Sequence, residues 1–338
     1  MIRQQPPLFG HLGTVMLLLS VAVLAFATEA YTEEAPDSPS DAATSDNSQA
    51  SSQDVPEASP ASSTAKTVLH LKGGLPEVLP IPGDPRPYAK SPYANQIDKA
   101  LAFLAFKDRD SNRLYRLVLL DYLQRKYCLH ERYSLKATYA PHLQDASFGD
   151  LGNMKRLIDP GFKADATVIE NASALERIAL KSLYCDIYPV EASLLDEMNT
   201  MIQEGMSPFV PTLGIAYLWL RDHGCLAGDP KLMLVRDALA VKLKKHLQDN
   251  GLSTYMVGQA LALLFEIGHA EMVQEDWIKT VAETQNEEGG WATAPGPDST
   301  GASNGMTTTH LLWALLEHAL PNAPATPMVR PATGAKAE

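Results

Sequence analysis

The chain has 338 residues, which leaves room for one large domain with extensions at its ends. Hydrophobic residues make up 45% of the sequence, enough for a globular core once the polar segments are set aside. The formal net charge of −12 argues against a nucleic-acid-binding protein, because phosphate binding needs concentrated lysine and arginine.

The N-terminal residues have the pattern of an export signal. Arg3 precedes an almost unbroken apolar run from Val15 to Ala27, and Ala25-Phe26-Ala27 supplies the small-x-small sequence that signal peptidase recognises. The run is shorter than the about 20 apolar residues of a membrane span. We therefore expect residues 1–27 to be a cleaved signal peptide and the protein to be exported, either periplasmic or secreted. The alternative is an uncleaved N-terminal membrane anchor, which would be the protein's contact with a membrane.

Two segments of unusual composition follow. Residues 28–66 consist mainly of Ser, Ala, Pro, Asp and Glu, and residues 67–94 are rich in proline. The first segment has too little apolar surface to offset its ordering entropy, so we expect a disordered acidic linker there. We expect the second segment to form an extended arm. Residues 321–338, at the other end of the chain, are expected to be a disordered tail.

Between residues 95 and 320 the apolar residues recur at helical spacing, and strand signals are sparse. We expect pairs of helices, the outer ones with a charged face and the inner ones apolar on most sides. The expected starts of the inner helices recur at roughly 40–60 residues, a period typical of stacked or closed arrays of helical hairpins. These starts lie near Arg113, Ser173, Val210, Thr254 and Met306.

One turn in this body carries a recognisable motif. The segment Gln285-Asn286-Glu287-Glu288-Gly289-Gly290-Trp291 resembles the Q-x-x-x-G-x-W repeat of terpene cyclases and the Gly-Gly turns of protein prenyltransferases. A predicted outer helix precedes it, and Thr309-His310 leads into an apolar helix after it. The resemblance implies an all-α fold: an (α/α) toroid of about five helical hairpins over residues 95–320, preceded by the disordered arm.

The catalytic motifs of these families are incomplete in this chain. Triterpene cyclases protonate their substrate with Asp-x-Asp-Asp, and the nearest match here is Asp108-Arg109-Asp110-Ser111, which we interpret as a helix-capping turn. Prenyltransferases hold zinc with an Asp-x-Cys pair and a later histidine. His310 stands at the position of that histidine, but Leu252 and Thr254 occupy the other two positions. We therefore predict no metal and no cofactor.

Cleavage of a polysaccharide is a third chemistry to consider, since helical toroids also carry secreted lyases and glycosidases. Such enzymes need convergent acid and base residues with aromatic platforms. Residues of these types are present: Glu170, Glu287, Glu288, Asp298, His310, Tyr255, Trp219 and Trp291. Because Glu287 and Glu288 fall in a predicted turn, where exposed carboxylates are ordinary, the sequence favours a non-catalytic role for them.

The resemblance also predicts where a ligand would bind. The inner helices of a toroid run in one direction, so their N-terminal ends meet at one rim. Free N–H groups at those ends favour anionic or strongly polar ligand groups. We expect any ligand-binding site at this rim, formed by Tyr255, Thr309, His310, Trp291, Arg113, Thr212 and Thr254. The alternative is that these side chains only cap helices and bond to one another.

The three cysteines are too few for a disulfide framework. Cys128 and Cys185 both end predicted inner helices at the same rim. Since an exported protein can form disulfides, we expect a bond between these two cysteines, with Cys225 left over.

Together these features favour a binding protein over an enzyme. We expect an exported toroid that binds a small molecule or a protein partner in its central cavity, without the zinc or Asp-x-Asp-Asp chemistry of the families it resembles. The alternative is a secreted enzyme that uses the same cavity on a glycan or an isoprenoid-type substrate. An acid, base and aromatic cluster at one rim would favour the enzyme, and a sealed apolar plug would favour the binding protein.

Overall fold

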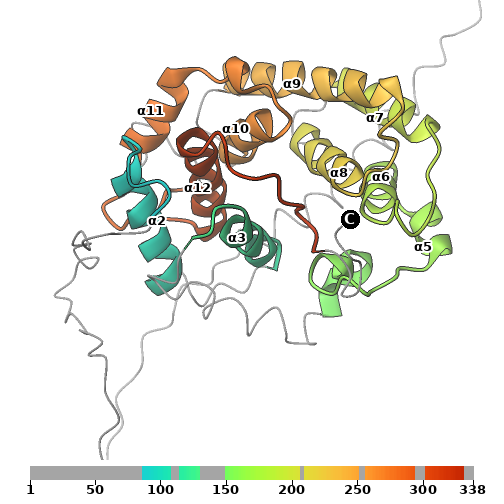
Figure 1. The fold of residues 1–338 in the computed structure, drawn as a ribbon, viewed down its shortest axis with the longest axis horizontal. Helices are drawn as coiled ribbons and strands as arrows, with labels where there is room; N and C mark the ends of the chain where they lie inside the picture. The colour runs from blue at the N-terminus through green and yellow to red at the C-terminus, as the bar shows by residue number, and fades with distance from the viewer. Residues whose placement is uncertain are drawn as a thin grey trace, which may run out of the picture. The chain divides into compact units, whose positions relative to one another are not determined.

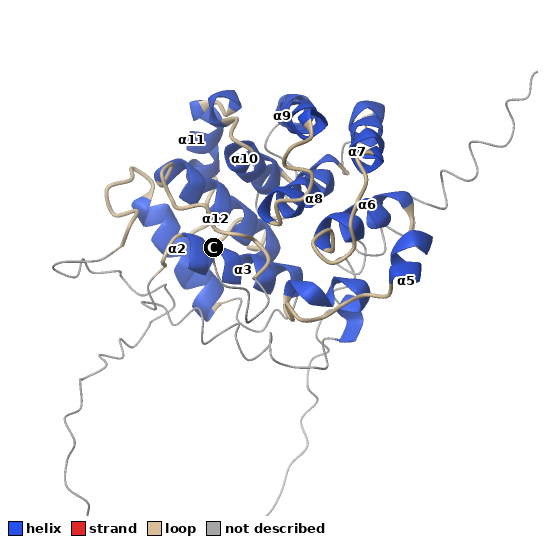
Figure 2. Ribbon diagram, turned by 45° about the vertical axis from the view of Figure 1, so that its right-hand side comes forward, coloured by secondary structure: helices blue, strands red, loops and turns tan. Residues whose placement is uncertain are grey.

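The computed structural model describes residues 86–107, 114–129, 149–205, 209–250, 256–293 and 301–330, all within one compact unit, residues 67–338. These residues form helices and connecting loops (Figure 2), with one isolated antiparallel bridge between Ala292 and Ser303. The expected signal peptide, acidic linker and most of the proline-rich arm lie outside the described residues. Among the helices described, none is long and apolar enough to cross a membrane.

The helices follow the chain in a simple order (Figure 1). They are α2 (Ala94–Phe106), α3 (Leu114–Lys126), the 3-10 helix η2 (Gly149–Leu157), α5 (Ala166–Asn171), α6 (Ala174–Leu183), α7 (Ser193–Glu204), α8 (Val210–Asp222), α9 (Pro230–Asn250), α10 (Val257–Glu266), the short η3 (Ala270–Met272), α11 (Glu275–Glu283) and α12 (Gly305–Ala319).

Burial separates inner from outer helices. In α8 every residue from Val210 to Leu220 is buried except Thr212, and α12 is buried without interruption from Thr307 to Glu317. The apolar helix α10 is buried to a similar extent. Helices α7, α9 and α11 bury one face each, and Figure 1 shows α9 and α11 on the outside of α8, α10 and α12. The predicted all-helical class is confirmed for the described residues, and α8, α10 and α12 are apolar helices with almost every residue buried.

The inner helices run in the same direction. Successive contacts join α6 to α8, α8 to α10, α10 to α12 and α12 to α3. A disulfide links the C-terminal ends of α6 and α8, and Arg221 at the end of α8 donates to the carbonyl oxygen of Glu266 at the end of α10, at 2.7 Å. Lys126 bonds to both Glu266 and Glu317, which joins the C-terminal ends of α3, α10 and α12. Their N-terminal ends consequently lie together as well.

The Gln285–Trp291 turn has the geometry that its sequence predicts. Gln285 Nε2 donates to the carbonyl oxygens of Gln96 and Gly289, both at 2.8 Å, and so satisfies backbone groups of two segments. Gly289 has a φ of 91°, a left-handed conformation that glycine adopts without strain. Trp291 is fully buried, and its Nε1 donates to the carbonyl oxygen of Val281 at 2.7 Å.

The predicted bond between Cys128 and Cys185 is wrong. Cys185 is bonded to Cys225, with their Cα atoms 6.2 Å apart, and Cys128 is an exposed free thiol. The reason is the packing order of the inner helices. Helix α6 packs against α8, so the residue that lies beside Cys185 is the cysteine that follows α8.

Part of the expected disordered tail is ordered. Residues 321–330 follow α12 and run between α3 and α8 (Figure 1). Met328 and Val329 are 5% and 2% exposed, as buried as the helical core. The disorder prediction is therefore wrong for residues 321–330, because it gave too little weight to these two apolar residues within a proline- and alanine-rich stretch. Residues 331–338 lie outside the described residues.

Candidate functional site

Three polar side chains meet at the N-terminal ends of the inner helices. Tyr115 comes from α3, Gln259 from α10 and His310 from α12. Gln259 Nε2 donates to the hydroxyl oxygen of Tyr115 at 3.2 Å. The rings of Tyr115 and His310 meet edge to face, with centroids 5.9 Å apart. We call these three residues the interior polar cluster, since Gln259 and His310 are only 5% and 3% exposed.

A glycine sets the spacing of this cluster. A Cβ atom at Gly258 would lie 2.6 Å from both the carbonyl carbon of His310 and the nitrogen of Leu311. These are backbone atoms within α12, which cannot turn aside as a flexible side chain would. Glycine at position 258 therefore permits the close contact between α10 and α12. Because the contact is with His310 itself, the next residue of α10, Gln259, lies near His310.

The cluster is uncharged near neutral pH. Burial lowers the pKa of His310 to about 4, because the charged imidazolium is disfavoured away from water. Burial also raises the pKa of the Tyr115 hydroxyl. The neutral imidazole carries one N–H donor and one acceptor nitrogen. Neither ring nitrogen has a hydrogen-bond partner in the described part of the chain.

The other predicted rim residues have structural roles or cannot be placed. Thr309 Oγ1 donates to the carbonyl oxygen of Gly305 in its own helix at 2.8 Å. The backbone N–H of the buried Trp291 donates to Thr308 Oγ1 at 3.0 Å. Thr212 is half-buried near the start of α8. Three predicted residues lie outside the described ranges: Arg113, Thr254 and Tyr255.

Tyr115 and Gln259 were not among the predicted site residues. Each stands near the start of an inner helix, as His310 does. A usable signal exists for Gln259, which is the one polar side chain in the otherwise apolar stretch from Val257 to Phe265. Such a residue in a fully buried helix must find a partner or face a polar site.

The opposite ends of the same helices hold a charged cluster. Lys126 Nζ lies 2.5 Å from Glu266 Oε1 and 2.7 Å from Glu317 Oε1. The hydroxyl of Tyr122 donates to Glu266, and Trp313 Nε1 donates to Glu317 at 2.9 Å. All three charged side chains are less than one-tenth exposed. We call Lys126, Glu266 and Glu317 the charged cluster.

The two carboxyl groups of the charged cluster have pKa values shifted in opposite directions. Burial and the neighbouring Glu266 raise the pKa of Glu317 to about 8. Burial alone would also raise the pKa of Glu266, but hydrogen bonds from Glu317 and Lys126 outweigh it and lower that pKa. Opposite pKa shifts mean that, of the two carboxyl groups, Glu317 holds a proton more readily, while Lys126 and Arg221 lie beside Glu266. This fully paired arrangement is that of a structural ion network.

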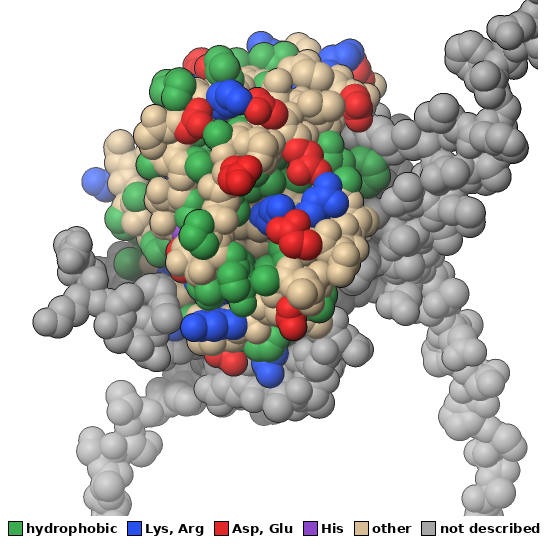
Figure 3. All heavy atoms as spheres, turned by 90° about the vertical axis from the view of Figure 1, so that its right-hand side faces the viewer, with side chains coloured by type: hydrophobic (Ala, Val, Ile, Leu, Met, Phe, Trp, Pro, Cys, Tyr) green, Lys and Arg blue, Asp and Glu red, His purple; other side chains and the backbone are tan. Residues whose placement is uncertain are grey.

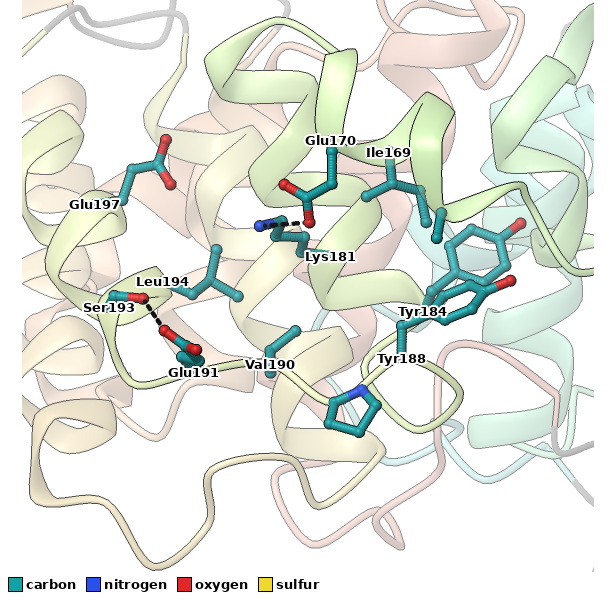
Figure 4. A pocket seen from close by; sticks show the side chains of 12 residues that line it. Ile169, Glu170, Lys181, Tyr184, Tyr188, Val190, Glu191, Ser193, Leu194 and Glu197 are labelled. Carbon is teal, nitrogen blue, oxygen red and sulfur yellow. Dashed lines mark hydrogen bonds and ion pairs between the residues drawn. The ribbon is translucent and has the colours of Figure 1, made fainter.

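A surface pocket of about 200 Å³ lies between α5, α6 and α7 (Figure 4). Lys181 Nζ pairs with Glu170 at 2.9 Å within it. The hydroxyls of Tyr184 and Tyr188, which line one side, both donate to backbone carbonyl oxygens at 2.7 Å. Figure 3 shows acidic and basic side chains next to one another on this side of the molecule. The polar groups named here already have partners, so this pocket is a weaker candidate than the interior polar cluster.

The two tryptophans considered for polysaccharide cleavage do not form an aromatic platform, and Tyr255 lies outside the described residues. Trp219 and Trp291 are 4% and 0% exposed, so neither offers a ring face to a sugar. Glu287 and Glu288 are exposed in the turn before Trp291. Asp298 lies outside the described residues.

Across the described residues, His, Cys, Asp and Glu side chains form no group of three or more that could hold a metal ion. No known protein family matches the chain, and neither curated proteins nor solved structures gave a match.

Proposed function

We propose that the protein is an exported (α/α) toroid that binds a ligand in its interior, at the cluster of Tyr115, Gln259 and His310. The observation that carries this proposal is His310, which is 3% exposed and has two ring nitrogens without a hydrogen-bond partner among the described residues. Leaving a buried polar group unpaired costs about 1–3 kcal/mol. A ligand that bonds to the ring would offset this cost.

Several features support the toroid. The inner helices are parallel and contact one another in series, and α9 and α11 lie outside them. The Gln285–Trp291 turn between α11 and α12 has the glycine conformation and the buried tryptophan expected of the terpene-cyclase and prenyltransferase repeat. In such a toroid the inner helices surround a central cavity, and the interior polar cluster would face it.

The disulfide supports export. Bonds such as Cys185–Cys225 persist in oxidising compartments outside the cytoplasm and are rare inside it. This agrees with the apolar run up to Ala27 and its small-x-small cleavage pattern. Export also fits the acidic segment 28–66, which would act as a spacer ahead of the helical body.

The chemistry of the cluster favours binding of an uncharged group. A neutral imidazole, a phenol and an amide supply hydrogen-bond donors and acceptors without formal charge. A hydroxyl, carbonyl or amide group of a ligand would match them. This differs from the anionic ligand that helix N-termini alone would suggest. General acid and base catalysis usually requires a titratable group with a pKa near the working pH, whereas the pKa of His310 is about 4.

Native mass spectrometry of the protein isolated from its natural cell envelope tests the proposal. A bound small molecule should be present in the wild type and lost in His310→Ala and Tyr115→Phe, with folding intact by circular dichroism. Glu170→Ala, in the surface pocket, is the control and should retain the molecule. Retention in both interior variants would place the ligand elsewhere. Chemical turnover of the bound molecule would favour the enzyme alternative.

A further inference from the structure

The segment after α12 returns across the C-terminal ends of the inner helices. Arg125 of α3 donates from Nη1 and Nη2 to the carbonyl oxygens of Pro327 and Met328, both at 2.8 Å. On the other side, the backbone N–H of Met328 donates to Asp222 of α8 at 2.9 Å. The segment is thus fixed to two inner helices that are distant from it in sequence. We call residues 321–330 the C-terminal strap.

Side chains of the strap are held as firmly as its backbone. Met328 and Val329 are buried. Arg330 Nε donates to Asp121 Oδ2 at 2.9 Å, and its Nη2 bonds to Oδ1 of the same carboxylate. This two-pronged pairing fixes orientation as well as distance. Apolar burial and charge pairing therefore act together over three consecutive residues.

These contacts flank the charged cluster. Arg125, which binds the strap backbone, is the neighbour of Lys126 in α3. Asp222, which binds Met328, pairs at 2.7 Å with Arg221, and Arg221 donates to the carbonyl oxygen of Glu266. On α3, the residue that binds the strap is therefore next in sequence to Lys126 of the cluster. On α8, Asp222 and Arg221 connect the strap to Glu266.

We propose that the C-terminal strap closes this end of the helical body and keeps water from the charged cluster. An ion network at low dielectric depends on the exclusion of water and on complete pairing. The strap is a suitable closing element because it is short, has no helix of its own and is held by a few contacts from residues 327–330 to α3 and α8. Segments of this kind open locally at a lower free energy than the packed helices around them.

Closure of one end by the strap determines from which end a ligand can enter the interior. With the C-terminal ends of the inner helices covered, a ligand would enter from the opposite end, where the interior polar cluster lies. The entry route rests on the proposed function, whereas the seal itself does not. A test on the ligand-free protein therefore separates the two.

Hydrogen exchange followed by mass spectrometry provides this test. One variant ends after Ala325 and lacks the anchoring residues, and the matched control ends after Arg330 and lacks only residues 331–338. In the first variant we expect peptides that contain Lys126, Glu266 and Glu317 to exchange at least about tenfold faster. Exchange in α7 and α9 should be unchanged, and the control should match the full-length protein.

A full-length variant, Arg330→Gln, guards against misfolding of the shortened chain. It removes the charge pair with Asp121 and should raise exchange at the same peptides by a smaller factor. Unchanged protection of these peptides in both variants would overturn the proposal. Loss of protection across all helices would overturn it too, because the segment would then belong to the cooperative core. No ligand is used, so failure here leaves the proposed function standing.

Discussion

The two ends of the inner helices bury polar groups in different ways. At the C-terminal ends of α3, α10 and α12, Lys126 bonds to both Glu266 and Glu317, and every charge has a partner. At the N-terminal ends of the same helices, the His310 ring lies beside Tyr115 without a hydrogen bond to any described residue. The charged end is therefore a structural network, and the uncharged end is the candidate site. Pairing, rather than polarity, distinguishes the two.

The largest expected effect on stability comes from a substitution that removes the cation of the charged cluster. In Lys126→Met the buried cation is lost, and the only cation left beside the ionised Glu266 among the described residues is Arg221, at 3.8 Å. Breaking a buried ion pair on one side typically costs 3–5 kcal/mol, and we expect a loss of about that size in urea unfolding at pH 7.

Lys181→Met is the matched control, because Lys181 pairs with Glu170 while these side chains are 27% and 62% exposed. Exposed pairs contribute only about 0–1 kcal/mol. Similar losses in the two variants would show that burial does not distinguish the charged cluster from a surface pair.

A second variant tests the close contact at the uncharged end. In Gly258→Ala the added methyl group meets backbone atoms of α12 at 2.6 Å, so α10 and α12 must separate. Overpacking of this kind costs about 1–3 kcal/mol, measurable by urea unfolding. Gly214→Ala serves as control, because its methyl group would meet the Leu263 side chain, at 2.8 Å, and a side chain can rotate away. An equal or larger loss in the control would contradict the argument.

Features that depend only on residues close together in the chain could be predicted from the sequence. The Gln285–Trp291 turn was predictable because its glycine conformation, its buried tryptophan and its helix-ending glutamine all follow from seven consecutive residues. Helices α8 and α10 were recognisable because burial on most sides removes polar residues from most of their positions. His310 was predicted from its place at the start of such a helix.

Long-range pairing was not predictable in the same way. The partner of Cys185 depends on which helix packs beside α6, and the sequence does not state this order. Tyr115 and Gln259 are site candidates because the structure places them beside His310. The sequence does not state which side of α3 or α10 faces α12. The ordered strap was not predicted because Met328 and Val329 stand in a stretch rich in proline and alanine. The surface that buries these two side chains belongs to other helices. Closure of the inner helices into a toroid stays a prediction.

The pH dependence of stability offers a further test of the charged end. The pKa of Glu317 is raised to about 8 by burial and by Glu266, against 4.5 for an unperturbed carboxyl group. The folded protein therefore holds a proton that the unfolded chain releases, and this stabilisation, complete below about pH 4.5, is lost as the pH rises to about 8. The groups around Glu317 are Lys126, Glu266, Tyr122, Tyr127 and Trp313.

We expect the free energy of unfolding to fall between pH 6.5 and 8, by at most about 1.4 kcal/mol per pH unit. Glu317→Gln cannot release the proton and should remove this slope. Unfolding curves in urea at half-unit pH intervals measure it. A wild-type slope that persists in Glu317→Gln would assign the titration to another group.

The smallest expected effect concerns the unpaired end and has the opposite sign. His310→Leu replaces two unpaired ring nitrogens by apolar atoms in a site that is 3% exposed. Removing an unpaired buried polar group gains about 1–3 kcal/mol, and imperfect repacking takes back up to about 1.5 kcal/mol. The ligand-free protein should therefore gain about 1 kcal/mol in its free energy of unfolding, measured in urea.

Tyr115→Phe is the matched control, and it should lose about 1 kcal/mol because the Gln259 amide is deprived of its acceptor. Opposite signs in neighbouring residues would mark His310 as kept at a cost to stability, as a binding residue is. A loss in His310→Leu comparable to that in Tyr115→Phe would mean that the ring is bonded within the fold, and the histidine would then be one more structural residue.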